Sequence, residues 1–310
     1  MTKIGIVGAG LIGRAWAIVF ARSGFDVALW DGDAKALNAA RGTINERLDD
    51  LKQAGLIDDP TSVLKRITLR ASLRETVADA GYVQENLPET VAIKQHVFAE
   101  MDELARADAI LASSTSSIPA SAFTESLKGR ARCLVAHPVN PPYLVPVVEL
   151  CGAPWTSPET IARTRALMEQ AGQVPVTVQR EIQGFILNRL QGALLNEAFR
   201  LVEDGYITVE DLDKTIAHGL GLRWSFMGPF ETIDLNAPGG VRDYCERYGP
   251  MYHELAKQQS DPRLWRGVVD RIEAERNRSL PREKLAERQT WRDRRLMALA
   301  AHKRKMQGSD

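Results

Sequence analysis

The chain has 310 residues, of which 44% are hydrophobic and 26% are charged. Its 40 lysines and arginines balance its 40 aspartates and glutamates, so the zero formal charge gives no electrostatic sign of a nucleic-acid or membrane partner. We expect two domains, because a single hydrophobic core rarely grows past ~250–300 residues.

The first predicted element is a buried strand in the short apolar run Lys3–Gly8. It leads into the pattern G-x-G-x-x-G, after which residues 14–23 are predicted to form a helix. In such a turn Gly8 permits the tight bend, Gly10 lets the backbone approach a pyrophosphate, and Gly13 lets the helix pack closely on the strand. The pattern therefore predicts a dinucleotide-binding loop.

The N–H groups at the start of this helix, at Leu11 and Ile12, are expected to bind the cofactor phosphates. The second predicted strand, Asp26–Trp30, is followed directly by Asp31. An acid there accepts hydrogen bonds from the adenosine ribose and repels a 2′-phosphate, so Asp31 predicts NAD rather than NADP. Asp33 is a lesser candidate for this role. The alternative is a glycine-rich turn that binds no ligand.

Short apolar runs alternate with amphipathic helical stretches as far as about Val178. This alternation predicts an α/β domain of the Rossmann type, with a doubly wound, mainly parallel sheet and helices on both faces. The long helical stretch 34–51 exceeds the minimal dinucleotide-binding unit and is interpreted as a surface insertion. Further strands are predicted at 67–69, 82–84, 109–112, 133–136, 145–150 and 174–178, and helices at 35–54, 91–106 and 158–171.

After residues 181–184 no strand is predicted, because the apolar residues change to helical spacing. We therefore expect an NAD-binding domain at residues 1–183 and an all-α domain at residues 184–310. The basic last helix is interpreted as a solvated face rather than a nucleic-acid surface. Helices of this domain are predicted at 185–204, 209–219, 240–259 and 281–306.

The three cysteines, Cys133, Cys151 and Cys245, are scattered and lack the C-x-x-C spacing of zinc sites. Their spacing argues against a disulfide framework or a bound metal and for a reducing compartment. The first apolar stretches are short and interrupted by Gly and Arg14, which predicts neither a signal peptide nor a membrane span. The expected location is cytoplasmic.

The stretch 135–150, VAHPVNPPYLVPVVEL, places His137 at the end of one apolar run and Glu149 inside a second. Two strands joined by its proline-rich link are expected to bring the acid to the histidine. A histidine oriented by a carboxylate moves a proton to or from a hydroxyl near neutral pH. Ser116, after a predicted strand, and Asn188, early in the second domain, are expected at the same cleft.

These residues resemble the 3-hydroxyacyl-CoA dehydrogenase family. The family pattern has a serine in an (S/N)TSS segment, an H-x-x-N-P segment, a glutamate twelve positions after the histidine, and G-F-(I/V)-x-N-R. The chain has SSTSS at 113–117, HPVNP at 137–141, Glu149, and GFILNR at 184–189. Two further segments, EAFRLVEDG and GLGLRWSFMGPFETIDLNA, extend the resemblance over nearly the whole chain and resemble the λ-crystallin branch.

The resemblance implies an NAD-dependent dehydrogenase. His137 is then the general base that removes the 3-hydroxyl proton, and Glu149 holds the imidazole and stabilises its protonated form. Ser116 and Asn188 are implied to hydrogen-bond the reacting oxygen.

Glu89 and Lys94, in the segment NLPETVAIK, correspond to family positions near the NAD riboses. Each candidate has an alternative interpretation. Glu89 and Lys94 would otherwise be an exposed pair at a helix start, and His137 would cap a strand. The neighbouring Ser117 is the second candidate for the catalytic serine, and Asn188 would otherwise make a local bond inside a helix.

The λ-crystallin branch implies a small 3-hydroxy acid, with L-gulonate, oxidised to 3-dehydro-L-gulonate, as the lead substrate. Its carboxylate needs a cation, for which Arg223 in GLGLRWSF is the candidate; the alternative is an arginine at the surface or a dimer interface. Other substrates for the same chemistry are a 3-hydroxyacyl-CoA, 3-hydroxybutyrate and L-carnitine. A non-catalytic protein of the crystallin type is the alternative from another class. Family members pair through the helical domain, which implies a homodimer.

Overall fold

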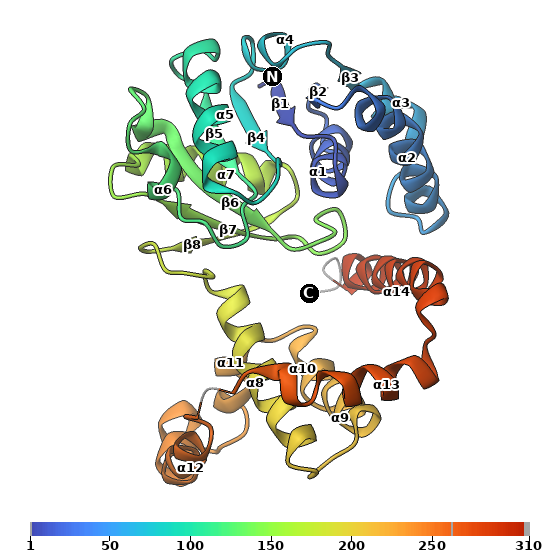
Figure 1. The fold of residues 1–310 in the computed structure, drawn as a ribbon, viewed down its shortest axis with the longest axis vertical. Coiled ribbons are helices and arrows are strands. Elements are labelled where there is room, and N and C mark those ends of the chain that lie inside the picture. The colour runs from blue at the N-terminus through green and yellow to red at the C-terminus, as the bar shows by residue number, and fades with distance from the viewer. Residues whose placement is uncertain (1, 262, 307–310) are drawn as a thin grey trace. The chain divides into compact units, whose positions relative to one another are not determined.

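The computed structural model describes residues 2–261 and 263–306 of the chain. These residues form two compact units, shown as a ribbon in Figure 1. The first unit comprises the chain up to Asn188 together with the segment from Gln289 onward, and the second is Arg189–Arg288. Within the described residues, no helix combines the length and the apolar composition needed to cross a membrane.

The first unit is built on one eight-stranded sheet with the order β3-β2-β1-β4-β5-β6-β7-β8. Strands β1 to β6 run parallel, β7 is antiparallel to β6, and β8 is parallel to β7. The prediction of a mainly parallel Rossmann-type sheet is confirmed. The strands are β1 (Ile4–Val7), β2 (Val27–Trp30), β3 (Ile67–Leu69), β4 (Tyr82–Glu85), β5 (Ile110–Ser113), β6 (Cys133–Pro138), β7 (Val147–Gly152) and β8 (Val174–Val178).

Two hydrophobic clusters cover the two faces of this sheet, because successive strand residues point to opposite sides. On β5, Ile110 and Ala112 belong to one cluster and Leu111 to the other. Both faces are covered by helices, as a parallel sheet with near-continuous apolar strands requires. The helices of this unit are α1 (Leu11–Arg22), α2 (Ala34–Gln53), α3 (Pro60–Lys65), α4 (Leu73–Val77), α5 (Val91–Leu104), α6 (Ser121–Thr124), α7 (Pro158–Gln170) and most of α14 (Leu285–Met306).

The two compact units differ from the predicted division at residues 183 and 184. The first unit continues to Asn188, and it also takes in α14 from Gln289 onward. The physical reason for the second difference is that Met297, 3% exposed, packs into the same cluster as Trp16. In addition, Nη1 of Arg304 donates to the carbonyl of Leu56 at 3.2 Å.

The second unit is entirely helical where it is described, in agreement with the predicted all-α region. Its buried hydrophobic cluster consists of Val202, Val209 and Val268. The predicted helix 209–219 is split, because α9 ends at Thr215 and a π-helical turn follows at Ile216–Leu220. The helices are α8 (Leu187–Glu203), α9 (Val209–Thr215), α10 (Gly221–Trp224), α11 (Pro229–Asp234), α12 (Gly240–Gln258) and α13 (Val269–Ser279).

Candidate active site

The loop between β1 and α1 has the backbone that its glycines predict. Gly8 has a φ of +98°, and a Cβ on Gly13 would lie 1.8 Å from the carbonyl oxygen of Gly8, so this residue must be glycine. A Cβ on Gly10, by contrast, would meet nothing within 4 Å. Open space at this position, with helix α1 starting beside it, fits the approach of a pyrophosphate.

The first turn of α1 presents backbone donors beside this open space. Arg14 is the first residue whose N–H bonds back into the helix, to the carbonyl of Gly10, so Leu11 and Ile12 contribute N–H groups without helical acceptors. Asp31 lies directly after β2 and accepts the N–H of Ala9 at 2.6 Å, which places its carboxylate against the loop. The residues present therefore fit a dinucleotide.

Asp31 and Asp33, the two candidate acids for the ribose, have different local partners. Asp31 Oδ1 accepts the N–H of Asp33 at 2.8 Å. The Asp33 carboxylate accepts the N–H of Lys35 and caps α2. Asp31 thus lies against the glycine loop itself, whereas Asp33 caps a helix, and Asp31 stays the predicted acid for the ribose hydroxyls.

His137 and Glu149 form a hydrogen-bonded pair, as the sequence predicts. They face each other directly across the antiparallel strands β6 and β7, and His137 Nδ1 lies 2.8 Å from Glu149 Oε2. Both residues are buried, His137 to 6% and Glu149 to 1% exposure. Because a carboxylate only accepts, Nδ1 carries the proton and Nε2 presents its lone pair.

The other carboxylate oxygen of Glu149 is held by the backbone. Its Oε1 accepts the N–H of Ile186 at 2.8 Å and of Leu187 at 2.9 Å. Burial opposes ionisation of this carboxyl, but the hydrogen bonds from His137 and from the two N–H groups outweigh it and lower the pKa of Glu149. The carboxylate is therefore ionised and fixed in orientation.

A sharp backbone bend at Phe185 precedes the two N–H groups that bind Glu149. It is fully buried, has a φ of +48°, and its ring centroid lies 5.6 Å from that of His137. Sequence reasoning missed Phe185 and the two N–H groups after it as parts of the site. The available signal was Gly184, because glycine readily adopts the positive φ, here +76°, that a sharp bend requires.

Ser116 and Asn188 are brought together by a direct contact. The side-chain Nδ2 of Asn188 donates to the backbone carbonyl of Ser116 at 2.8 Å. Asn188 thus belongs to the first unit and follows the two residues whose N–H groups bind Glu149. Ser116 is exposed, whereas the hydroxyl of the alternative serine, Ser117, lies 3.4 Å from Glu89 Oε1 and donates to it.

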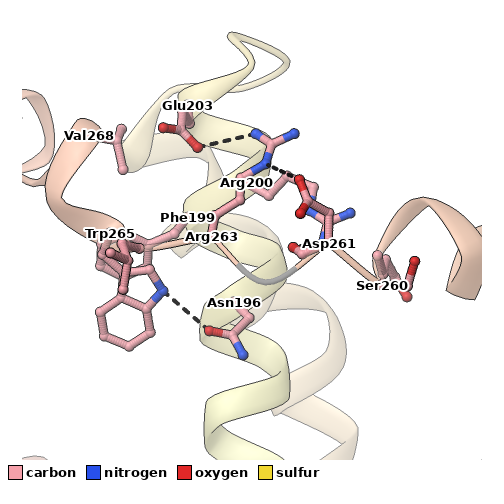
Figure 2. Close-up of a pocket in the computed structure, with 11 residues that line it drawn as sticks. Asn196, Phe199, Arg200, Glu203, Ser260, Asp261, Arg263, Trp265 and Val268 are labelled. Atoms are coloured by element: carbon pink, nitrogen blue, oxygen red, sulfur yellow. Dashed lines mark hydrogen bonds and ion pairs between the residues drawn. The ribbon is translucent and has the colours of Figure 1, made fainter.

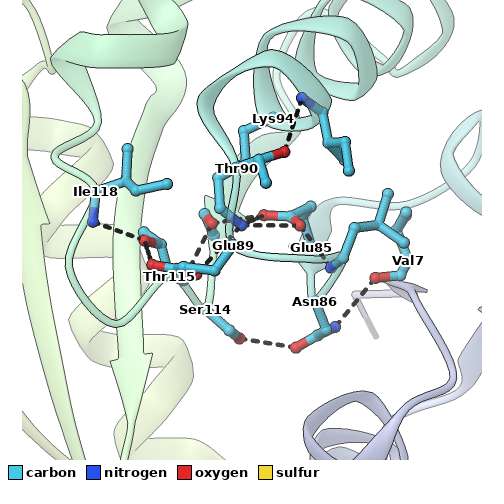
Figure 3. Close-up of polar contacts among 12 residues, drawn as sticks. Val7, Glu85, Asn86, Glu89, Thr90, Lys94, Ser114, Thr115 and Ile118 are labelled. Atoms are coloured by element: carbon cyan, nitrogen blue, oxygen red, sulfur yellow. Dashed lines mark hydrogen bonds and ion pairs between the residues drawn. The ribbon is translucent and has the colours of Figure 1, made fainter.

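Glu89 is exposed, with 41% of its side-chain surface accessible, as the alternative interpretation expects, but Lys94 is not. Lys94 is 1% exposed, and its Nζ bonds both carboxylate oxygens of the buried Glu85, at 3.1 Å and 2.9 Å. Figure 3 shows Glu85, Glu89 and Lys94 in one polar cluster with Thr115. Sequence reasoning missed Glu85, although a glutamate ending the apolar strand YVQE indicates a buried charge with a partner.

A second polar cluster lies beside the glycine loop. The hydroxyl of Ser114 donates to Asn86 Oδ1 at 2.7 Å and accepts from Gln84 Nε2 and from Trp16 Nε1. Asn86 in turn donates to the carbonyl of Val7, the last residue before the loop (Figure 3). These bonds fix the end of β1 to the ends of β4 and β5, and the sequence analysis did not identify them.

Arg223, the candidate for the substrate carboxylate, lies on α10 in the second unit and is exposed. Its role toward the substrate stays a prediction. The second unit also has its own cavity of about 180 Å³, lined by residues such as Arg200, Arg263 and Trp265 (Figure 2). None of the predicted site residues lines that cavity.

The chain is similar to known proteins over most of its length. Residues 3–182 match the NAD-binding domain of 3-hydroxyacyl-CoA dehydrogenase, and residues 184–278 match the C-terminal domain of that family. A human λ-crystallin homologue is 41% identical over 308 residues, covering 97% of this chain and 96% of its own length. An L-carnitine dehydrogenase of Bacillus cereus is 37% identical over 87% of this chain and 82% of its own.

Two solved structures extend the comparison. A 5-formyl-3-hydroxy-2-methylpyridine 4-carboxylic acid 5-dehydrogenase, described as an NAD+-dependent dismutase, is similar with a TM-score of 0.83 and 28% identity over 99% of both chains. A (S)-3-hydroxybutyryl-CoA dehydrogenase of Ralstonia eutropha is similar with a TM-score of 0.70 and 28% identity, over 87% of this chain and 94% of its own.

Proposed function

Because the chain belongs to the 3-hydroxyacyl-CoA dehydrogenase family of NAD-dependent oxidoreductases, we propose that it oxidises the 3-hydroxyl of a small free 3-hydroxy acid. The lead substrate is L-gulonate, which would become 3-dehydro-L-gulonate. The observation that carries this proposal is the buried pair of His137 and Glu149, whose geometry suits removal of a hydroxyl proton. The similarity to L-carnitine dehydrogenases, whose named substrate is a free 3-hydroxy acid, supports a free acid.

In the proposed reaction His137 accepts the hydroxyl proton at Nε2, because Nδ1 is already bonded to Glu149. Glu149 stabilises the resulting imidazolium, since its carboxylate is held ionised by backbone N–H groups. Ser116 and Asn188 hold the reacting oxygen; Asn188 has a second amide hydrogen besides the one that it donates to Ser116. Bound NAD supplies the hydride acceptor at its nicotinamide ring.

The cofactor would lie on the glycine loop. The N–H groups of Leu11, Ile12 and Gly13 would bind its phosphates, and Asp31 its adenosine ribose. Glu89 is proposed near the ribose of the nicotinamide half, and Lys94 would act there through Glu89, because its own ammonium group is buried.

A substrate panel tests the proposed function. NADH fluorescence is followed after mixing the protein and saturating NAD with L-gulonate, L-carnitine, 3-hydroxybutyrate and a 3-hydroxyacyl-CoA in turn. We expect the highest kcat/KM with L-gulonate. L-Carnitine is the second candidate, because dehydrogenases of that substrate are 35–37% identical to this chain. Faster turnover of the CoA thioester would refute the free acid, and NAD binding without any turnover would support a crystallin-like structural protein.

The same proposal includes a homodimer formed through the helical unit. This unit exposes several large apolar side chains, among them Leu222, Phe226 and Phe230. Its described hydrophobic cluster is small and contains three buried residues, all valines. Apolar surface of this extent is typical of a protein interface. Sedimentation is expected to give twice the 34.4 kDa mass of the chain, and a monomer at micromolar concentration would contradict this part of the proposal.

A further inference from the structure

The loop that carries Ser116 is fastened to one carboxylate oxygen. Oε1 of Glu89 accepts the backbone N–H of Ser116 at 2.9 Å and that of Ser117 at 3.1 Å. The same oxygen accepts the hydroxyl of Thr115, a contact drawn in Figure 3. Donors from three consecutive residues thus converge on one charged acceptor, and hydrogen bonds to a charged group are the stronger kind.

The second carboxylate oxygen of Glu89 faces the buried Lys94. Glu89 Oε2 lies 3.9 Å from Nζ of Lys94, which is also bonded to the buried Glu85. Burial opposes ionisation of Glu89, but the bond from Thr115, the charge of Lys94 and the two N–H groups of the loop outweigh it and lower its pKa. The acceptor is therefore charged when the loop is in place.

Both backbone groups of Ser116, its N–H and its carbonyl, are hydrogen-bonded to side chains. Its N–H is bonded to Glu89, and its carbonyl accepts Nδ2 of Asn188 at 2.8 Å. The backbone on both sides of the residue is thus fixed. Within the described part of the chain, no hydrogen bond engages the Ser116 hydroxyl, which leaves it available to a ligand.

We propose that Glu89 is a positioning residue for Ser116: it fixes the backbone of the serine loop so that the hydroxyl meets the reacting oxygen. This inference rests on the proposed function, in which Ser116 holds that oxygen. The positioning role and a role beside the NAD ribose are distinguished by which measured constant changes when Glu89 is replaced. A positioning role lowers kcat, whereas a ribose contact alone raises the dissociation constant of NAD.

The first test is a double-mutant cycle with the best substrate of the panel. Glu89→Ala should lower kcat by about 10- to 100-fold, because a catalytic group misplaced by about 1 Å costs roughly that much. In a Ser116→Ala background the same change should lower kcat by at most about twofold, since residues that act through one another are not additive. Glu89→Gln, which keeps an acceptor oxygen, should recover part of the loss. Equal effects in both backgrounds would overturn the proposal.

A matched control uses the same kind of bond a few residues away. Oε1 of Glu181 accepts the backbone N–H of Ser121 at 2.8 Å, at the start of α6. Glu181→Ala therefore removes a carboxylate-to-backbone bond in the same unit without touching Ser116, and its kcat should stay near wild type. A loss as large as that of Glu89→Ala would assign the effect to general loosening of the fold.

The second test needs no turnover. Amide hydrogen exchange of residues 114–118 should be faster in Glu89→Ala than in wild type and unchanged in Glu181→Ala. If the wild-type protein oxidises none of the panel substrates, the proposed function fails, while the exchange result still decides whether Glu89 fixes the loop. Unchanged protection of this segment in Glu89→Ala would refute the positioning role by itself.

Discussion

The two units of the chain differ in how completely they bury their own side chains. In the first unit, large apolar clusters cover both faces of the sheet, and the buried charges of Glu85 and Lys94 are paired. In the second unit, the described cluster has three valines, while Phe226 and Phe230 are 70% and 78% exposed. The proposed proton-transfer residues therefore belong to the unit that buries its own apolar side chains more completely. The helical unit leaves several large apolar side chains exposed.

The first prediction, which concerns the free energy of unfolding, tests whether α14 belongs to the first unit. Met297→Ala should lower the free energy of unfolding by about 2–5 kcal/mol, because it leaves a cavity in a packed core. The control is Leu299→Ala on the same helix, where the side chain is 41% exposed and the loss should be much smaller. Denaturant unfolding measures both variants. Equal losses would contradict the assignment of α14 to the first core.

The second prediction places the chemistry in the first unit. His137→Gln should lower kcat by at least ~10², the usual range for loss of a general base, and leave the dissociation constant of NAD near wild type. Fluorescence titration with NADH measures the binding and initial rates measure kcat. A variant that keeps its kcat would remove His137 from the reaction.

The third prediction asks whether the second unit contributes to binding only. Arg223→Met should raise KM for L-gulonate by about tenfold or more, because a hydrogen bond to a charged group contributes roughly 1.5–3 kcal/mol. The kcat value should change little. Arg242→Met, another exposed arginine of this unit, is the matched control. An unchanged KM in Arg223→Met would remove this residue from the substrate site.

The parts of the first unit that local chemistry dictates were predictable from the sequence. The glycine spacing determines the loop at Gly8 and Gly13, and the strand alternation determines the sheet. The pairing of His137 with Glu149 was also predictable, because a short proline-rich link between two apolar runs brings facing residues together. These features depend on neighbours in sequence or on a repeated pattern.

Features that depend on distant segments were not predictable in the same way. The last helix has a polar sequence, and it belongs to the first unit because of contacts with distant segments, such as the burial of Met297 in the cluster that contains Trp16 and the bond from Arg304 to Leu56. Glu89 was identified as a candidate, but its bonds to residues 115–117 join the ends of two different strands. The hydrophobic pattern of a single sequence does not predict such a contact, because the contact depends on which loops meet at the edge of the sheet.

The last prediction compares a buried carboxylate of the first unit, Glu149, with a partly exposed one of the second, Asp243. The pKa of Glu149 is held below its ordinary value of 4.5, and that of Asp243 is lowered by a hydrogen bond from Arg247. A lowered folded-state pKa contributes stability above the unfolded value, and this stability is lost as the pH falls through the folded value. Solvent screens the pair of the partly exposed Asp243 and the exposed Arg247, so this pair contributes little.

Glu149→Gln should therefore flatten the loss of stability below pH 4.5, whereas Asp243→Asn should leave the slope as in wild type. Denaturant unfolding at a series of pH values from 7 down to about 3 measures the slopes of all three proteins. The comparison holds if only the Glu149 variant departs from wild type, because Glu149 is buried together with its donor His137, whereas Asp243 and its donors are partly open to solvent. A slope changed as much by Asp243→Asn would show that the helical unit also holds its charges in a protected environment.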